Sequence, residues 1–180
     1  MAATPEYQQL ISAIKKKAKK ESKENKEFFR ALKRKKPAGL SKAFKQYHDE
    51  AFSHINCLNC ANCCRTSLAV FGPKDVARIS KHFSMDKKEF IKKYLTPHPD
   101  YDYLIKTLPC PFLAKDNKCT IYEIRPEGCR TYPPAKLRLT DEQLDVIHDN
   151  VGICPAVNEM VDKIKSKFEV KAISQKPKAF

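Results

Sequence analysis

The sequence between residues 57 and 64 reads Cys57-Leu58-Asn59-Cys60-Ala61-Asn62-Cys63-Cys64, and it holds four of the eight cysteines of this 180-residue chain. Spacings of two residues let successive thiolates converge on one centre from a tight loop, and three in a row match the opening of the bacterial ferredoxin pattern. The fourth ferredoxin cysteine is absent, and Cys64 directly follows Cys63 instead. Because neighbouring side chains of an extended chain point to opposite sides, Cys64 can belong to a second site or be a free thiol.

Four more cysteines follow at Cys110, Cys119, Cys129 and Cys154. Eight thiolates can fill two four-coordinate positions, as two zincs or two cubane clusters, or four can hold one cluster while the others are redox-active or structural. An isolated cysteine can also be a small buried hydrophobe. No histidine follows the cysteines at the spacing of mixed zinc sites, and the ferredoxin-like triplet favours an iron–sulfur cluster over zinc.

The compartment we expect is the cytoplasm. A signal peptide needs an apolar stretch of ~7–15 residues, whereas the apolar residues between 10 and 14 run directly into three lysines. Cytosolic thiols stay reduced, so clustered cysteines there bind metals or do redox chemistry rather than form disulfides. No apolar run approaches the ~20 residues of a membrane span.

Glycine usage excludes several enzyme classes. The chain has only four glycines, and they form neither a dinucleotide-binding GxGxxG loop nor a P-loop. The nucleophile elbow of the α/β-hydrolases and the HExxH zinc-protease motif are absent as well. The catalytic residues, and whether the protein is an enzyme, therefore remain open.

Positive charge is concentrated at the start of the chain. The net charge is +14, and the first fifty residues carry fourteen Lys or Arg against six Asp or Glu, with no cysteine. We expect a basic helical arm over 1–53, a cysteine-cluster metal-binding domain over 54–170 and a flexible tail over 171–180. The lysine runs at 15–20 and 33–36 can contact nucleic-acid phosphates, with Phe28 and Phe29 stacking on bases, or they can meet an acidic protein partner or serve solubility alone.

Hydrophobic periodicity predicts the elements. Apolar residues at helical spacing predict one long helix from residue 7 to about 32, a break at Pro37–Gly39, and further helices over 40–51, 73–83, 87–95, 144–151 and 157–168. Short strands are expected over 101–107 and, after a turn at 115–118, over 119–124. The fold class is mainly α with a small irregular β portion, its helices arranged around a metal-organised cysteine-rich core.

The cysteine block resembles the signature of the CxxCxxCC proteins, the YkgJ-type family described as zinc- or iron-chelating. Three later segments are also similar, in the family's order: Cys110-Pro111-Phe112-Leu113, then Cys119-Thr120-Ile121-Tyr122, then Arg125-Pro126-Glu127-Gly128-Cys129-Arg130-Thr131-Tyr132-Pro133. Cys154-Pro155 fits the family's last cysteine, so the resemblance covers about 55–155. A related branch, the flagellin lysine methylases, is associated with iron–sulfur chemistry and S-adenosylmethionine.

The function expected is metal binding through an iron–sulfur cluster of the 4Fe–4S kind, or through zinc, in a redox, cluster-handling or protein-modification role. The ligands expected, in descending order, are Cys57, Cys60 and Cys63, then Cys110, Cys119, Cys129 and Cys154, with Cys64 last. Arg125 and Arg130 flank Cys129, where they can offset thiolate charge, grip an anionic cofactor or pair with nearby glutamates. The alternatives are a structural zinc module whose basic helix binds nucleic acid or an acidic partner, and a cluster-dependent methyl-transfer enzyme.

Overall fold

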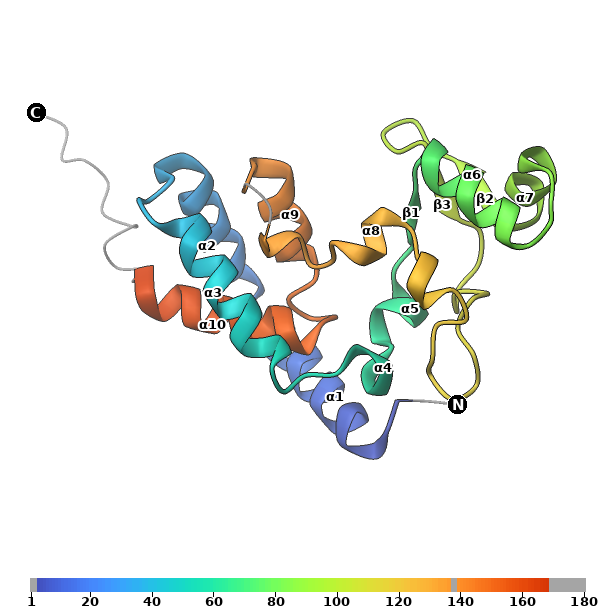
Figure 1. Ribbon diagram of the computed structural model, residues 1–180. Helices are drawn as coiled ribbons and strands as arrows, with labels where there is room; N and C mark the ends of the chain where they lie inside the picture. Colours follow the sequence, from blue (N-terminus) through green and yellow to red (C-terminus); the bar gives the residue numbers. More distant parts are fainter. Residues whose placement is uncertain (1–2, 137–138, 169–180) are drawn as a thin grey trace, which may run out of the picture. The chain divides into compact units, whose positions relative to one another are not determined.

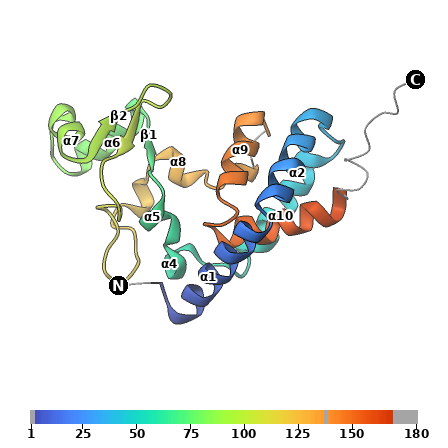
Figure 2. The ribbon, with the colours of Figure 1, turned by 180° about the vertical axis from the view of Figure 1, so that it is seen from behind.

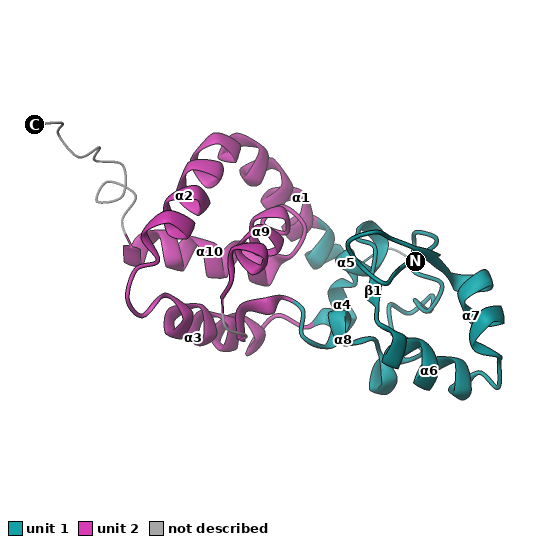
Figure 3. Cartoon of the chain, turned by 90° about the horizontal axis from the view of Figure 1, so that it is seen from above, with its two compact units in different colours: residues 1–8, 57–132 teal, residues 9–56, 133–180 magenta. Residues whose placement is uncertain are grey.

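The computed structural model describes residues 3–136 and 139–168, so the predicted tail lies outside the described residues. The chain forms two compact units, which Figure 3 distinguishes by colour: unit 1 comprises residues 1–8 and 57–132, and unit 2 comprises residues 9–56 and 133–180. The chain passes from unit 2 to unit 1 after residue 56. The segment 54–170, predicted as one domain, contains parts of both units.

The predicted fold class is confirmed, because the chain is mainly helical with one small antiparallel sheet. Within the described residues, no helix is long and apolar enough to cross a membrane. The described elements of unit 2 are all helical. Figure 1 labels its α-helices, of which the first begins in unit 1: α1 (Pro5–Lys20), α2 (Ser22–Lys35), α3 (Leu40–Phe52), α9 (Asp141–Asp149) and α10 (Pro155–Phe168).

The long basic helix predicted from the sequence is divided into α1 and α2 at Glu21. Helical hydrogen bonds nevertheless continue through this residue, since the Glu21 N–H donates to the Lys17 carbonyl at 2.9 Å and the Asn25 N–H donates to the Glu21 carbonyl at 2.8 Å. Glu21 itself has a φ of −92° and a ψ of 10°, which are not helical, so α1 and α2 are two helices in succession (Figure 2). The break before α3 falls at Pro37–Gly39 as predicted, where Lys36 and Gly39 take positive φ values of 43° and 77°.

The core of unit 2 is built from the apolar stripes of α2, α3, α9 and α10. The predicted faces of α3 and α10 are both confirmed by burial of their apolar positions. The completely buried large side chains of this core are Phe28, Phe29, Leu32, Phe44, Ile147, Met160 and Ile164. Burial of such side chains stabilises the unit by roughly 1.5–3 kcal/mol each, before the entropy cost of ordering them.

Unit 1 combines short helices with a three-stranded sheet. Its strands β1 (Val70–Phe71), β3 (Tyr103–Ile105) and β2 (Leu95–Pro97) pair antiparallel in the order β1-β3-β2, so the strand predicted over 101–107 is confirmed. The helices α6 (Pro73–His82) and α7 (Lys87–Tyr94) are confirmed as well, and the Asp86 carboxylate caps α7 by accepting from the Lys88 N–H at 2.8 Å. The cysteine-bearing segments form α4 (Cys57–Cys60), α5 (Asn62–Thr66), a 3-10 turn η1 (Tyr122–Ile124) and α8 (Glu127–Arg130).

The strand predicted over 119–124 is wrong. Only one bridge forms, between Leu113 and Cys119, after a turn in which Asn117 has a φ of 72°. The Ile124 N–H then donates to the Ile121 carbonyl at 3.0 Å and closes the 3-10 turn. The alternation of apolar and polar residues, which predicted a strand, did not reveal this turn. The turn buries Ile121 in the core of unit 1.

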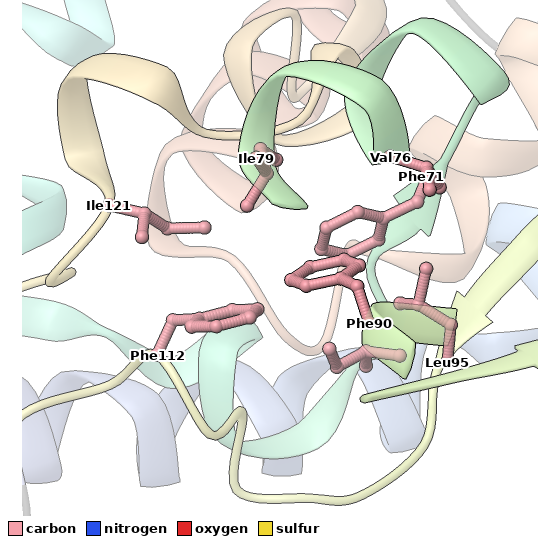
Figure 4. Close-up of a cluster of buried hydrophobic side chains, with 8 residues drawn as sticks. Phe71, Val76, Ile79, Phe90, Leu95, Phe112 and Ile121 are labelled. Atoms are coloured by element: carbon pink, nitrogen blue, oxygen red, sulfur yellow. The ribbon is translucent and has the colours of Figure 1, made fainter. Parts of the chain in front are cut away.

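The core of unit 1 connects the sheet and helices to the cysteine loops. Phe71, Phe90 and Phe112 lie face to face or tilted at centroid distances of 6.3–6.4 Å, and Figure 4 shows them together with Ile79, Leu95 and Ile121. Cys110 and Cys119 pack against the edge of this cluster. Because Phe112 lies between these two cysteines in the sequence and is buried, its burial anchors the loop that carries both thiols.

Candidate metal centre

The block Cys57–Cys64 folds as two short helical turns rather than an extended loop. Cys57 and Cys60 begin and end α4, three positions apart, which is the spacing that brings side chains to one side of a helix. Ala61 then reverses the chain with a φ of 46°, a left-handed conformation that is unusual for a residue other than glycine. Cys63 and Cys64 follow inside α5. The sequence argument that they point to opposite sides assumed an extended chain and is wrong, since neighbours on a helix are only ~100° apart.

The second cysteine segment is tied directly to the first. The Cys110 N–H donates to the Cys64 carbonyl at 2.8 Å, so the two backbones touch at the cysteines themselves. Cys119 pairs with Leu113 across the following turn, and the Thr120 N–H donates to the Phe112 carbonyl at 2.8 Å. These bonds place Cys110 and Cys119 on a closed loop beside α5.

Cys64 is the thiol that connects the others electrostatically. A hydrogen bond with Cys63 lowers the pKa of Cys64 to about 7, against the effect of its burial and with help from the positive charge of Arg65. Burial raises the pKa of five other cysteines, and the negative charge of the Cys64 thiolate adds to each increase; these are Cys57, Cys60, Cys110, Cys119 and Cys129. The residue ranked last from the sequence is therefore the one whose charge reaches thiols from every cysteine segment of unit 1.

Burial holds most of these thiols in the protonated form. Removal from water raises the pKa of Cys57 and of Cys110 to about 11, and that of Cys129 to about 12, with neighbouring thiolates adding to each shift. Cys57 and Cys129 are exposed as whole residues, so solvent moderates the effect there, whereas Cys110 is half-buried. A bound metal cation would favour the deprotonated form of these thiols instead, because the thiolate is the metal-binding form of cysteine.

Two arginines lie among the thiols. Arg125 lowers the pKa of Cys57, Cys119 and Cys129 through its charge, and its guanidinium stacks over the Tyr122 ring at 3.9 Å. Arg65 was not predicted from the sequence, although its place directly after Cys64 was a signal. It donates to the Cys60 carbonyl at 3.0 Å and hydrogen-bonds Asn117.

Arg130, which was expected beside Arg125 as a cofactor-binding residue, has other partners. Its Nε lies 3.9 Å from a carboxylate oxygen of Glu127, and it donates to the Glu123 carbonyl at 3.4 Å. The ion pair with a neighbouring glutamate, one of the alternatives considered for it, is therefore present.

A buried carboxylate positions the segment that leads to Cys129. Both oxygens of Asp75 accept from the Glu127 N–H at 3.2 Å, and one of them pairs with Arg78 at 2.7 Å. Arg78 also donates to the carbonyls of Ile124 and Arg125. This pair joins α6 to the start of α8, and sequence reasoning missed it because an Asp in the first turn of a helix is ordinary.

Cys154 lies in unit 2 rather than with the other seven cysteines. It is buried at the start of α10, and its N–H donates to the Asn150 carbonyl at 2.9 Å. Among the described residues, no three His, Cys, Asp or Glu side chains already stand close enough together to hold a metal ion.

The donor set in unit 1 is made of thiols from separate segments that influence one another's ionisation, and sulfur-only sets of this kind are typical of zinc and iron–sulfur proteins. The family model of the CxxCxxCC proteins, described as a putative zinc- or iron-chelating domain, matches residues 56–155. The chain belongs to this family, and the resemblance in its sequence is confirmed. No curated protein and no solved structure matches the chain.

Proposed function

We propose that unit 1 binds an iron–sulfur cluster through its cysteines. The observation that carries this proposal is the central place of Cys64, whose thiolate charge acts on five further cysteines. A structural zinc and a single iron–sulfur cluster are each held by four protein ligands, so the thiols of unit 1 are sufficient for either centre. The ferredoxin-like spacing of Cys57, Cys60 and Cys63 favours the cluster.

The guanidinium groups support a cluster of this kind. Several thiolates and inorganic sulfides together carry a negative charge, and Arg65 and Arg125 each act on the thiols through their positive charges. Arginine suits this position because it is always charged and is less strongly hydrated than lysine. Hydrogen bonds and charges around the sulfurs are also among the factors that set a cluster's reduction potential.

We further propose a redox or cluster-handling role in the cytoplasm. Cys57 and Cys129 are exposed, so one edge of the centre is open to solvent and to a partner. When bound, a cluster supplies one-electron chemistry, and an open edge shortens the path to an electron donor, an electron acceptor or a cluster acceptor. A reducing compartment keeps the thiols available.

The test is anaerobic purification of the full chain, with iron, zinc and acid-labile sulfide measured on one sample together with its absorption spectrum. Iron and sulfide in similar amounts with visible absorption would support the cluster, whereas zinc without visible absorption would overturn it in favour of a zinc site. We expect Cys64→Ser to lose most of the metal. His82→Ala is the matched control, since His82 is an exposed histidine of unit 1 and should leave the metal content unchanged.

A further inference from the structure

The outer face of α1 and α2 carries a regular row of positive charge. We name it the basic ladder, and its six members are exposed and recur at steps of three or four residues: Lys16, Lys19, Lys23, Lys26, Arg30 and Arg34. This spacing is that of one face of an α-helix. The opposite face holds the buried Ile14, Asn25, Phe28 and Leu32, so the ladder points away from the core of unit 2.

The ladder continues across the junction of the two helices. The hydrogen bonds through Glu21 keep the spacing of four residues, although Glu21 itself has a φ of −92° and a ψ of 10°, which are not helical. From Lys16 to Arg34 the row covers eighteen residue steps, which is about 27 Å along the two helices at 1.5 Å per residue. One positive charge therefore recurs about every 5 Å along the two successive helices.

Several other lysines of unit 2 have acidic partners. Lys17 pairs with Asp162, Lys33 with Asp145 at 2.6 Å, and Lys165 with Glu21 and Glu24 at 2.9 Å. Within the described residues no ladder side chain has an ion pair or hydrogen bond of this kind. The acidic side chains thus pair with these lysines, whereas the positive charges of the ladder remain exposed to solvent.

The side chains around the basic ladder distinguish between an acidic protein, a membrane surface and a nucleic acid as its partner. A protein interface is centred on buried aromatic or aliphatic anchors, but the only large apolar side chain exposed on α1 or α2 is Leu10, which lies outside the ladder. Insertion into a membrane surface needs an exposed apolar face, and the apolar face of these helices is buried. Stacking on single-stranded bases, expected from Phe28 and Phe29, is excluded because both rings are at most 2% exposed.

We propose that the basic ladder binds the phosphate backbone of double-stranded nucleic acid. A duplex presents closely spaced phosphates on a rigid frame and requires no base stacking, so a row of exposed cations can contact several phosphates at once. The contact is electrostatic and independent of base sequence. It does not depend on which metal unit 1 holds.

The number of cations sets the expected salt dependence. Six phosphate contacts give a slope of about −5 for log affinity against log salt on duplex DNA, since each contact contributes about −0.9. Affinity should then fall about a thousandfold between 50 and 200 mM salt. With four contacts removed, the slope should shrink to about −2 and the fall over the same range to about tenfold.

The experiment uses the full metal-loaded chain and fluorescence anisotropy with labelled 20-base-pair DNA and RNA duplexes over a range of salt. The ladder variant combines Lys19→Gln, Lys23→Gln, Lys26→Gln and Arg30→Gln. The matched control makes the same change in net charge on the exposed lysines of α7 in unit 1, with Lys87→Gln, Lys88→Gln, Lys92→Gln and Lys93→Gln. Far-ultraviolet circular dichroism and metal content establish that both variants are folded.

Steep salt dependence that is lost in the ladder variant and kept in the control would support the proposal, with DNA, RNA or both as the duplex bound. Equal losses in the two variants would overturn it, because net charge alone would then explain binding. Stronger binding to polyglutamate or to phosphatidylserine vesicles than to either duplex would overturn it in favour of an acidic protein or a membrane surface.

Discussion

Asp75→Asn tests how the fold positions the cysteines. The substitution keeps the size of the side chain but removes its charge and replaces one acceptor oxygen with a donor NH2. In the native protein both carboxylate oxygens accept, from the Gly72 N–H at 3.1 Å, from the Glu127 N–H at 3.2 Å and from Arg78 at 2.7 Å. An asparagine cannot satisfy this group of donors, and its own NH2 would face one of them.

The magnitude follows from the partners lost. Removing one member of a buried ion pair costs about 3–5 kcal/mol, and hydrogen bonds to a charged group contribute about 1.5–3 kcal/mol each. Asp75 is buried but the Arg78 side chain is 34% exposed, so water compensates part of the loss. We expect the free energy of unfolding of unit 1 to fall by about 2–3 kcal/mol, and metal occupancy to fall with it because Glu127 begins the helix that carries Cys129.

The assay is urea denaturation of metal-free and metal-loaded protein, followed by circular dichroism, with metal content measured in parallel. Asp86→Asn is the matched control, since Asp86 is an exposed N-cap of α7 and asparagine caps as well as aspartate. An Asp75→Asn protein within about 0.5 kcal/mol of the wild type, with full metal content, would refute the argued role of the buried pair.

Three further outcomes are expected. Burial raises the pKa of Cys57, Cys110 and Cys129, so these thiols must lose protons when a metal binds, and metal affinity should rise with pH between about 6 and 9. Competition with a chelator measures the affinity, and calorimetry in two buffers measures the protons released. Burial lowers the pKa of His48, so as pH falls the unfolded chain binds a proton at a higher pH than the folded protein does, and unit 2 should lose stability below about pH 6.5. Urea denaturation at several pH values should show this dependence in the wild type and its loss in His48→Gln. Lys36→Gly should increase the free energy of unfolding of unit 2 by about 1 kcal/mol, because Lys36 has a φ of 43° at the end of α2, a left-handed conformation that glycine adopts without strain. The urea midpoint should therefore rise, and an unchanged midpoint would contradict this reasoning.

The pattern of neighbouring residues in the sequence was sufficient to predict many of the helices. The helical spacing of apolar residues over 73–83 and 87–95 predicted α6 and α7, and the Pro37–Gly39 break was placed correctly. Those features depend on neighbouring residues alone. The segment 119–124 failed because its shape follows from burial of Ile121 in a distant core, which alternation does not encode.

The sequence pointed to the cysteines but not to their arrangement. Their ranking as ligands assumed an extended chain at Cys63–Cys64, where the protein has a helix. The interleaving of two units, which assigns Cys154 to unit 2, depends on pairing segments far apart in the sequence. Likewise, Asp75 and Arg78 acquire their role only when α6 meets the start of α8.

X-ray absorption spectroscopy of the anaerobically purified full chain tests the central claim most directly, because it reports both the metal and the atoms bound to it. The account predicts an iron edge and a first shell of sulfur alone, with a metal–metal scattering component from a polynuclear centre. A zinc edge with four sulfur ligands at about 2.3 Å would contradict the cluster while keeping a cysteine site. A first shell dominated by nitrogen or oxygen would contradict cysteine ligation itself.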